Sequence, residues 1–182
     1  MRIIAGAWRG RVLQAPAGQS TRPTADRVRQ AIFDRLMHAP WAGRALLDGA
    51  TVLDAFAGTG ALGLEALSRG AADAVFMERD RAALQALRAN VSACRAGDRC
   101  AVLACDALRP PPGRPCAVAF LDPPYGQSLV PRAVAALSGA GWLAPGAVLV
   151  AEVGADEPPP DLPGALAQFS HGAAAVHVFR HP

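Results

Sequence analysis

Residues 52–70, VLDAFAGTGALGLEALSRG, constrain the fold more than any other part of the chain. An apolar run ends at Asp54, and Gly58, Gly60 and Gly63 follow with the spacing G-x-G-x-x-G before a helix-like segment. Glycines with this spacing let the backbone turn sharply and approach a ligand closely. The stretch predicts a strand, a turn and a helix that bind either a dinucleotide or S-adenosylmethionine (SAM).

Strand-like and helix-like segments continue to alternate through the rest of the chain. Short apolar runs predict strands, and longer segments with apolar residues every three or four positions predict helices. The expected strands are 50–56, 73–79, 100–107, 116–124, 146–153, 165–170 and 174–180, and the expected helices are 60–70, 80–94 and 129–143. This order predicts an α/β, Rossmann-like parallel sheet with helices on both faces, ending in an antiparallel pair of strands.

The first 44 residues do not follow this alternation, so the sequence divides into residues 1–44 and 45–182. Residues 2–16 predict a small N-terminal β-hairpin, because two short apolar runs flank a turn that contains glycine. Two Pro-rich stretches later in the chain predict surface loops rather than linkers between further domains.

Residues 20–39 predict a loop followed by a helix. Thr24 is suited to the N-cap of that helix, since its hydroxyl can accept a hydrogen bond from a free backbone N–H. Apolar residues that recur every four positions predict the buried stripe of the helix, which is Val28, Ile32 and Leu36.

Basic charge is concentrated in the same N-terminal region. Residues 1–44 hold eight Arg and two acidic residues, a net charge of +6, whereas the remaining 138 residues have a net charge of −3. A basic arm on a mildly acidic body favours a polyanionic partner such as nucleic acid. The candidate contacts to phosphate are Arg2, Arg9, Arg11, Arg22, Arg27 and Arg29.

Acidic residues follow several of the expected strands, at the edge where such sheets bind ligands. Glu78 stands about 20 positions after the first glycine, where an acid holds a ribose hydroxyl of either cofactor. Asp54 favours SAM, because a carboxylate there would repel a pyrophosphate but attract the ammonium and sulfonium groups of SAM. Asp106 can accept a hydrogen bond from an adenine amino group.

The tetrapeptide Asp122-Pro123-Pro124-Tyr125 ends the fourth expected strand. The Asp122 carboxylate and the Pro123 carbonyl provide two acceptors for the two N–H bonds of an amino group on a base, which would aim its lone pair at a methyl donor. Tyr125 offers a ring on which the base can stack. This pattern predicts methyl transfer to an exocyclic amine.

Other features of the sequence exclude several classes of protein. The four Cys have no C-x-x-C spacing and the four His are scattered, so we expect neither a metal site nor a disulfide framework. The sequence has no apolar run long enough for a membrane helix and no signal-peptide core, which indicates a cytoplasmic protein.

Several of these segments together resemble the RsmD family of bacterial 16S ribosomal RNA guanine-N2 methyltransferases. DAFAGTGALGLEALSRGA and DPPY are similar to its SAM and catalytic motifs, and RIIAGAWRGRVL and RPTADRVRQAIFDRL are similar to its N-terminal signature. The likeness covers nearly the whole chain. DPPY marks amino methyltransferases in general, and the N-terminal signature narrows the resemblance to this family.

The resemblance implies a seven-stranded SAM-dependent methyltransferase domain at 45–182 and an RNA-binding arm at 1–44. It implies a monomer that acts on 16S rRNA in the small ribosomal subunit or its late precursor. The residues that it places around SAM are Asp54, Phe56, Gly58, Thr59, Gly60, Glu78, Arg79, Asp106 and Ala107. The residues that it places at the target base are Asp122, Pro123, Pro124 and Tyr125. Arg22 and Thr24 match its signature and approach either the methionine carboxylate or the RNA, a choice that the sequence leaves open.

Two other hypotheses stay open at this point. A DNA adenine-N6 methyltransferase would use the same tetrapeptide, although the small size of the chain favours RNA. An NAD-binding oxidoreductase or a non-catalytic RNA-binding assembly factor would use the glycine-rich turn or the basic arm without methyl transfer.

Overall fold

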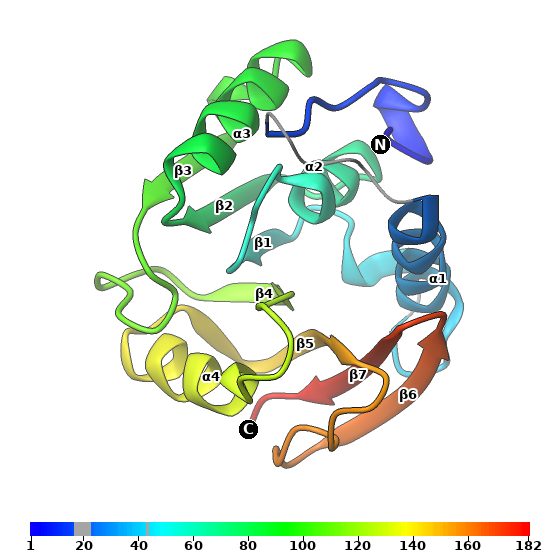
Figure 1. Cartoon of the computed structure of the whole chain (residues 1–182), viewed down its shortest axis with the longest axis vertical. Coiled ribbons are helices and arrows are strands. Elements are labelled where there is room, and N and C mark those ends of the chain that lie inside the picture. The colour runs from blue at the N-terminus through cyan, green and yellow to red at the C-terminus, as the bar shows by residue number, and fades with distance from the viewer. Residues whose placement is uncertain (17–22, 43) are drawn as a thin grey trace.

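The computed structural model describes residues 1–16, 23–42 and 44–182 and contains one seven-stranded sheet in the order β3-β2-β1-β4-β5-β7-β6. The first five strands run parallel, whereas β7 is antiparallel to both β5 and β6. The strands are β1 (Thr51–Asp54), β2 (Asp73–Glu78), β3 (Cys100–Ala104), β4 (Cys116–Leu121), β5 (Leu143–Gly154), β6 (Ala165–His171) and β7 (Ala174–Arg180). The predicted α/β Rossmann-like sheet with its antiparallel end is confirmed (Figure 1).

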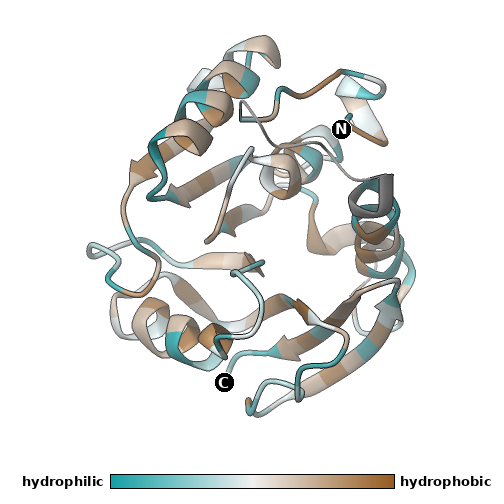
Figure 2. Ribbon diagram, in the orientation of Figure 1, coloured by the Kyte–Doolittle hydropathy of each residue, from teal (hydrophilic) through white to brown (hydrophobic). Residues whose placement is uncertain are grey.

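Helices cover both faces of this sheet, as predicted (Figure 1). Alternate strand residues face opposite sides, so Val52 packs with the helices of one face and Leu53 with the helix of the other. One face is covered by α1 (Pro23–His38), α2 (Ala61–Ser68) and α3 (Arg81–Ala93), and the other by α4 (Leu129–Gly139). Hydrophobic residues run along the strands, whereas hydrophilic residues recur along the helices (Figure 2).

The helix predicted in the N-terminal region packs directly on the sheet. Its expected stripe of Val28, Ile32 and Leu36 is buried, and the ring centroid of Phe33 lies 5.5 Å from that of Phe120 on β4. The helix begins at Pro23, so Thr24 falls inside it rather than at its N-cap. The helix therefore begins two residues earlier than an N-cap at Thr24 would give.

The predicted N-terminal hairpin is reduced to a single antiparallel bridge between Arg2 and Val12. A 3₁₀ turn, η1 (Gly6–Trp8), interrupts the first run. The pairing is short because the backbone N–H groups of Ile4, Ala5 and Trp8 donate to side chains of α2 instead of to a second strand. This N-terminal segment, residues 1–16, is called the arm from here on, and it is attached to α2, the helix that follows the glycine-rich turn.

Two further 3₁₀ turns, η2 (Arg44–Leu46) and η3 (Gly97–Arg99), precede β1 and β3. None of the helices in the described part of the chain is both long enough and apolar enough to cross a membrane.

Candidate functional site

The carboxyl ends of β1, β2, β3 and β4 surround a cavity of about 570 Å³. Most of the residues predicted to bind the cofactor or the base line it: Phe56, Gly58, Glu78, Arg79, Asp106, Ala107, Asp122, Pro123, Pro124 and Tyr125. Its volume is within the range of small-molecule sites, roughly 300–1,000 Å³. Four segments that are far apart in the sequence thus meet at one edge of the sheet because parallel strands end there together.

The glycine-rich turn is held by the neighbouring strand tip. The N–H of Gly58 donates a hydrogen bond to Oε2 of Glu78 at 2.7 Å. Gly60 has a positive φ of 79°, and a Cβ there would lie 2.3 Å from Cδ1 of Leu87. A Cβ on Gly63 would lie 2.3 Å from the ring of Phe76. The last two glycines are therefore required for α2 to pack closely on β2 and α3.

Glu78 is oriented by three backbone donors. Its Oε1 accepts hydrogen bonds from the N–H groups of Arg79 and Asp80, both at 2.7 Å, while its Oε2 accepts the bond from Gly58. A carboxylate fixed in this way presents its remaining acceptor positions to the cavity that it lines. This arrangement is suited to a ribose hydroxyl.

Asp106 already has partners inside the cavity wall. Its Oδ2 accepts a hydrogen bond from Nη1 of Arg79 at 3.1 Å, and its Oδ1 accepts the N–H of Leu108 at 2.9 Å. The Arg79 side chain is 68% exposed, so this ion pair contributes little to stability. Both side chains are thus free to exchange partners with a ligand.

A second cavity of about 210 Å³ adjoins the first and shares Phe56, Gly58 and Asp122 with it. Its lining also contains Asp54 and Thr59, whereas Gly60 lines neither cavity. Oδ2 of Asp54 accepts the N–H of Gly63 at 2.9 Å. Burial raises the pKa of Asp54 to about 7, although the hydrogen bond from Gly63 favours the charged form; the Glu78 carboxylate raises it further.

Three carboxyl groups line this second cavity, those of Asp54, Asp122 and Glu152. Asp122 reaches solvent through the cavities, but the protein packed around its carboxyl group raises its pKa well above the ordinary value, and Glu152 and Asp54 raise it further. Burial also raises the pKa of Glu152. A positively charged or hydrogen-bond-donating ligand would relieve this accumulation of negative charge.

Tyr125 is 46% exposed at the mouth of the first cavity. Its hydroxyl donates a hydrogen bond to Oε1 of Glu152 at 2.5 Å. The next residue is also held, because the N–H of Gly126 donates to Oε1 of Glu157 at 2.8 Å. Glu152 of β5 therefore sets the position of the Tyr125 side chain, a contact that the sequence did not predict.

The predicted phosphate contacts are distributed over the arm and α1. Arg2, Arg9 and Arg27 are exposed and line one cleft of about 430 Å³. Arg11 is also exposed, and its Nη1 donates to the carbonyl of Ala93 at the end of α3. Arg22 and the side chain of Thr24 lie outside the described residues.

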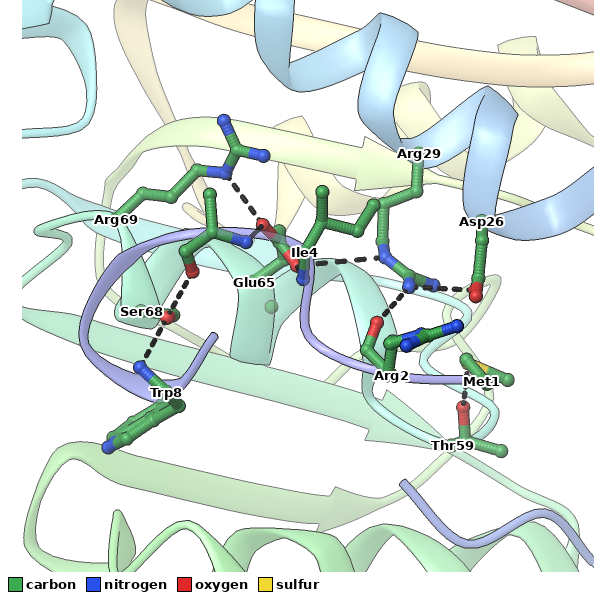
Figure 3. A network of polar contacts seen from close by, with 12 residues as sticks. Met1, Arg2, Ile4, Trp8, Asp26, Arg29, Thr59, Glu65, Ser68 and Arg69 are labelled. Atoms are coloured by element: carbon green, nitrogen blue, oxygen red, sulfur yellow. Dashed lines mark hydrogen bonds and ion pairs between the residues drawn. The ribbon is translucent and has the colours of Figure 1, made fainter. Parts of the chain in front are cut away.

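The prediction that Arg29 contacts phosphate is wrong. Its side chain is 4% exposed, and its Nη2 donates to the carbonyl of Arg2 at 2.5 Å and to Oδ1 of Asp26 at 2.9 Å (Figure 3). Its Nε lies 3.8 Å from Oε2 of Glu65. Arg29 lies one turn before the buried Phe33, and residues 1–16 pack over it and close it to an external phosphate.

Glu65 on α2 joins the arm to the domain, and sequence reasoning missed it. It is fully buried, accepts the N–H groups of Ile4 and Ala5 at 2.7 and 3.0 Å, and forms an ion pair with Arg69 at 2.7 Å (Figure 3). The available signal was an acidic residue inside an otherwise apolar helix, a position that charged side chains occupy when they have buried partners.

Asn90 on α3 makes a second connection that the sequence did not predict. Its Nδ2 donates to the carbonyl of Thr59 at 2.9 Å and to that of Gln14 at 3.0 Å, and its Oδ1 accepts the N–H of Gln14 at 2.7 Å. The glycine-rich turn is therefore tied to the arm through a buried amide.

In the described residues, no group of three or more His, Cys, Asp or Glu could hold a metal ion.

Comparison with known proteins identifies relatives along nearly the whole chain. A family model described as Conserved hypothetical protein 95 matches residues 1–180. The chain is 40% identical over 165 residues to Ribosomal RNA small subunit methyltransferase D of Escherichia coli (strain K12), which covers 90% of this chain and 79% of that relative. It is 37% identical over 163 residues to the Haemophilus influenzae protein of the same name, which covers 87% and 81%. The solved structure of yhhF from Escherichia coli matches with a TM-score of 0.85 at 34% identity and covers 100% of this chain and 97% of that one.

Proposed function

Because this chain belongs to the RsmD family, described as Conserved hypothetical protein 95, we propose that it methylates ribosomal RNA with SAM as the methyl donor. In finer detail, the methyl acceptor is the exocyclic N2 amine of a guanine in 16S rRNA, within the small subunit or its late precursor. Relatives that are 37–40% identical carry the name Ribosomal RNA small subunit methyltransferase D, which supports this substrate class.

The observation that carries the proposal is the position of Asp122. It lines the first cavity together with Glu78 and Asp106, and it also lines the adjoining cavity together with Asp54. A base amine bound by Asp122 would therefore lie beside a cofactor held at the tips of β1 and β2. Had Asp122 been remote from Asp54 and Glu78, the tetrapeptide could not have presented an amine to that cofactor.

The residues around the first cavity fit SAM. Glu78 is fixed by three N–H donors and can accept hydrogen bonds from ribose hydroxyls. Asp54 lies where its carboxylate would attract the ammonium and sulfonium groups. Asp106 and Ala107 would contact the adenine, and Phe56, Gly58 and Thr59 would surround the methionine end. A contact between Gly60 and SAM stays a prediction from the sequence, since Gly60 lines neither cavity.

SAM, when bound, supplies an electrophilic methyl group on a positively charged sulfur. Asp122 and the carbonyl of Pro123 would accept the two N–H bonds of the amine, and Tyr125 would stack on the base. Attack by the nitrogen lone pair forms the N–C bond as the C–S bond breaks, with its electron pair going to sulfur. The spare proton then leaves the nitrogen for the Asp122 carboxylate or water. The target guanine has to leave its stack to enter the cavity.

The arm would hold the RNA through its phosphates. Arg2, Arg9 and Arg27 line one basic cleft beside α1, and such clusters bind nucleic acid through counterion release. The roles of Arg11, Arg22 and Thr24 in this contact stay predictions. We also keep the monomer and the cytoplasmic location as parts of this proposal.

Methyl transfer to defined substrates tests the function. The purified protein is incubated with methyl-labelled SAM and with free 16S rRNA, small subunits or duplex DNA, and the methylated nucleoside is identified by mass spectrometry and mapped. We expect N2-methylguanosine at one position of 16S rRNA. N6-methyladenine in DNA, or no transfer together with tight NAD binding, would overturn the proposal.

A further inference from the structure

Glu152 lies near the carboxyl end of β5, on the strand next to Asp122. β4 and β5 run parallel with Leu121 opposite Ala151, so Asp122 and Glu152 each follow one member of that pair. Both side chains line the smaller cavity. The base-binding tetrapeptide therefore has a second carboxyl group beside it that belongs to a different strand and to no motif in the sequence.

The hydrogen bonds of Glu152 leave part of its carboxyl group available. Oε1 accepts the hydroxyl of Tyr125 at 2.5 Å, which orients the carboxyl group. Within residues 1–16, 23–42 and 44–182, no donor lies within hydrogen-bond distance of its other oxygen, Oε2. Glu152 is half-buried, so an acceptor is held in a fixed orientation in a cavity of limited access.

A second acceptor beside Asp122 distinguishes the two purines. In guanine, the ring position next to the N2 amine is N1–H, a donor. In adenine, the ring position next to the N6 amine is N1 without hydrogen, an acceptor. Asp122 alone binds an amine and cannot separate these bases. A neighbouring carboxylate accepts a hydrogen bond from N1–H of guanine. With adenine, the carboxylate would face the lone pair of N1, so two acceptors would be left without a hydrogen bond in a desolvated cavity, and binding would be weaker.

We infer that Glu152 determines base specificity by accepting the N1–H of the target guanine through Oε2 while Oε1 holds Tyr125 against the same base. This inference rests on the proposed function, since it concerns recognition within the same site. It assigns the preference for guanine over adenine, which the tetrapeptide leaves undetermined, to the neighbouring strand.

Specificity can be measured on small subunits that carry either guanine or adenine at the mapped position, obtained by mutating the rRNA gene. Glu152→Gln keeps the shape of the side chain but offers an amide N–H to adenine N1, whereas Glu152→Asp keeps the carboxylate. We expect Glu152→Gln to lower kcat/KM for guanine by roughly 10-fold to 100-fold and to reduce the guanine-to-adenine ratio by at least as much. Glu152→Asp should keep the wild-type direction of preference.

Three controls separate recognition from structure. Tyr125→Phe removes the hydroxyl bond but leaves the Glu152 carboxylate, so it should slow transfer without changing the ratio. Asp156→Asn removes an exposed acid from the loop after β5 and should change neither. SAM affinity and the melting temperature report whether each variant is folded.

A Glu152→Gln enzyme with the wild-type rate and ratio would overturn the inference, and so would equal losses of specificity in the Gln and Asp variants. Failure of the wild-type protein to methylate guanine N2 at all would instead overturn the proposed function. The two failures are therefore distinguishable in the same experiment.

Discussion

Asp54 at the end of β1 accepts the N–H of Gly63, in the first turn of α2, at 2.9 Å. The bond closes the glycine-rich turn on itself and holds the carboxyl group beneath it. Asp54 is 1% exposed, so its negative charge is buried in the protein. Burying a charge costs free energy, and a bound cation would reduce this cost. This one contact links the packing of α2 to the electrostatics of the site.

Replacement of Asp54 by Asn should stabilise the protein at neutral pH. Its pKa is raised from 3.8 to about 7, so between these values the folded protein binds the proton more tightly than the unfolded chain does, and stability falls as the pH rises through this window. The asparagine side chain carries no charge, so this loss of stability does not occur, and its amide oxygen can still accept the N–H of Gly63. At roughly 1.4 kcal/mol per pKa unit, the gain in free energy of unfolding should approach about 4 kcal/mol above pH 7.

Urea denaturation at about pH 4 and about pH 8 measures this difference. The gain should be absent at the lower pH, where Asp54 is protonated in the folded state. The same variant should bind SAM more weakly, since it lacks the charge that attracts the ammonium group. An equal effect on stability at both pH values would contradict the assigned pKa.

Asp122→Asn should reduce methyl transfer by about 100-fold to 1,000-fold, because an oriented acceptor for the charge that develops on nitrogen is lost. SAM should still bind, since Glu78, Asp54 and the glycine-rich turn are unchanged. Single-turnover transfer and calorimetric titration with SAM give the two readouts. Equal losses of binding and transfer would mean that Asp122 acts on the cofactor rather than on the base.

The basic cleft should make RNA binding steeply dependent on salt. Changing Arg2, Arg9 or Arg27 to Ala should each reduce the slope of log K against log salt by about 1 and weaken binding to any RNA sequence similarly. Arg114→Ala is the matched control, because this exposed arginine precedes β4 and does not line the cleft. A control that lowers the slope as much as the cleft variants would argue against a dedicated cleft.

Glu65→Ala should release the arm from α2. The change removes the acceptor of two backbone N–H groups and leaves the buried guanidinium of Arg29 with less compensation, and the loss of one buried partner typically costs about 3–5 kcal/mol. Urea denaturation measures the loss, and proteolysis within residues 1–16 should become faster. Asp34→Ala, an exposed acid on α1, should change neither result. Unchanged cleavage of the arm would show that other contacts suffice to dock it.

The local pattern of apolar residues and glycines in the sequence predicted most of the fold correctly. The strand ending at Asp54, the turn through Gly60 and the helix after it are determined by residues close together in sequence, and burial then selects one face of each element. The strand β5 was predicted at 146–153 but extends over Leu143–Gly154, because Leu143 pairs with Cys116 of β4 at its start and Gly154 pairs with Ala174 of β7 at its end.

The short extent of the hairpin and the burial of Arg29 could not be predicted in the same way. Whether residues 2–16 pair as strands depends on competing donors and acceptors, and the acceptors Glu65 and Ser68 stand some 60 positions away. Periodicity shows which side of α1 is apolar but not what covers its polar side. Glu152 has no motif around it, so its place beside Asp122 follows from the register of β4 and β5.

The sequence by itself determined the order of the elements, the strand tips that carry acids and glycines, and the position of the tetrapeptide Asp122–Tyr125 after a strand, since these depend on periodicity, turn geometry and residue chemistry over short stretches. The tertiary structure alone decided which distant side chains meet: Tyr125 with Glu152, Glu65 with the arm, and Asn90 with the turn. The reason is physical. Contacts between distant segments depend on strand order, register and burial, which no short stretch of sequence contains.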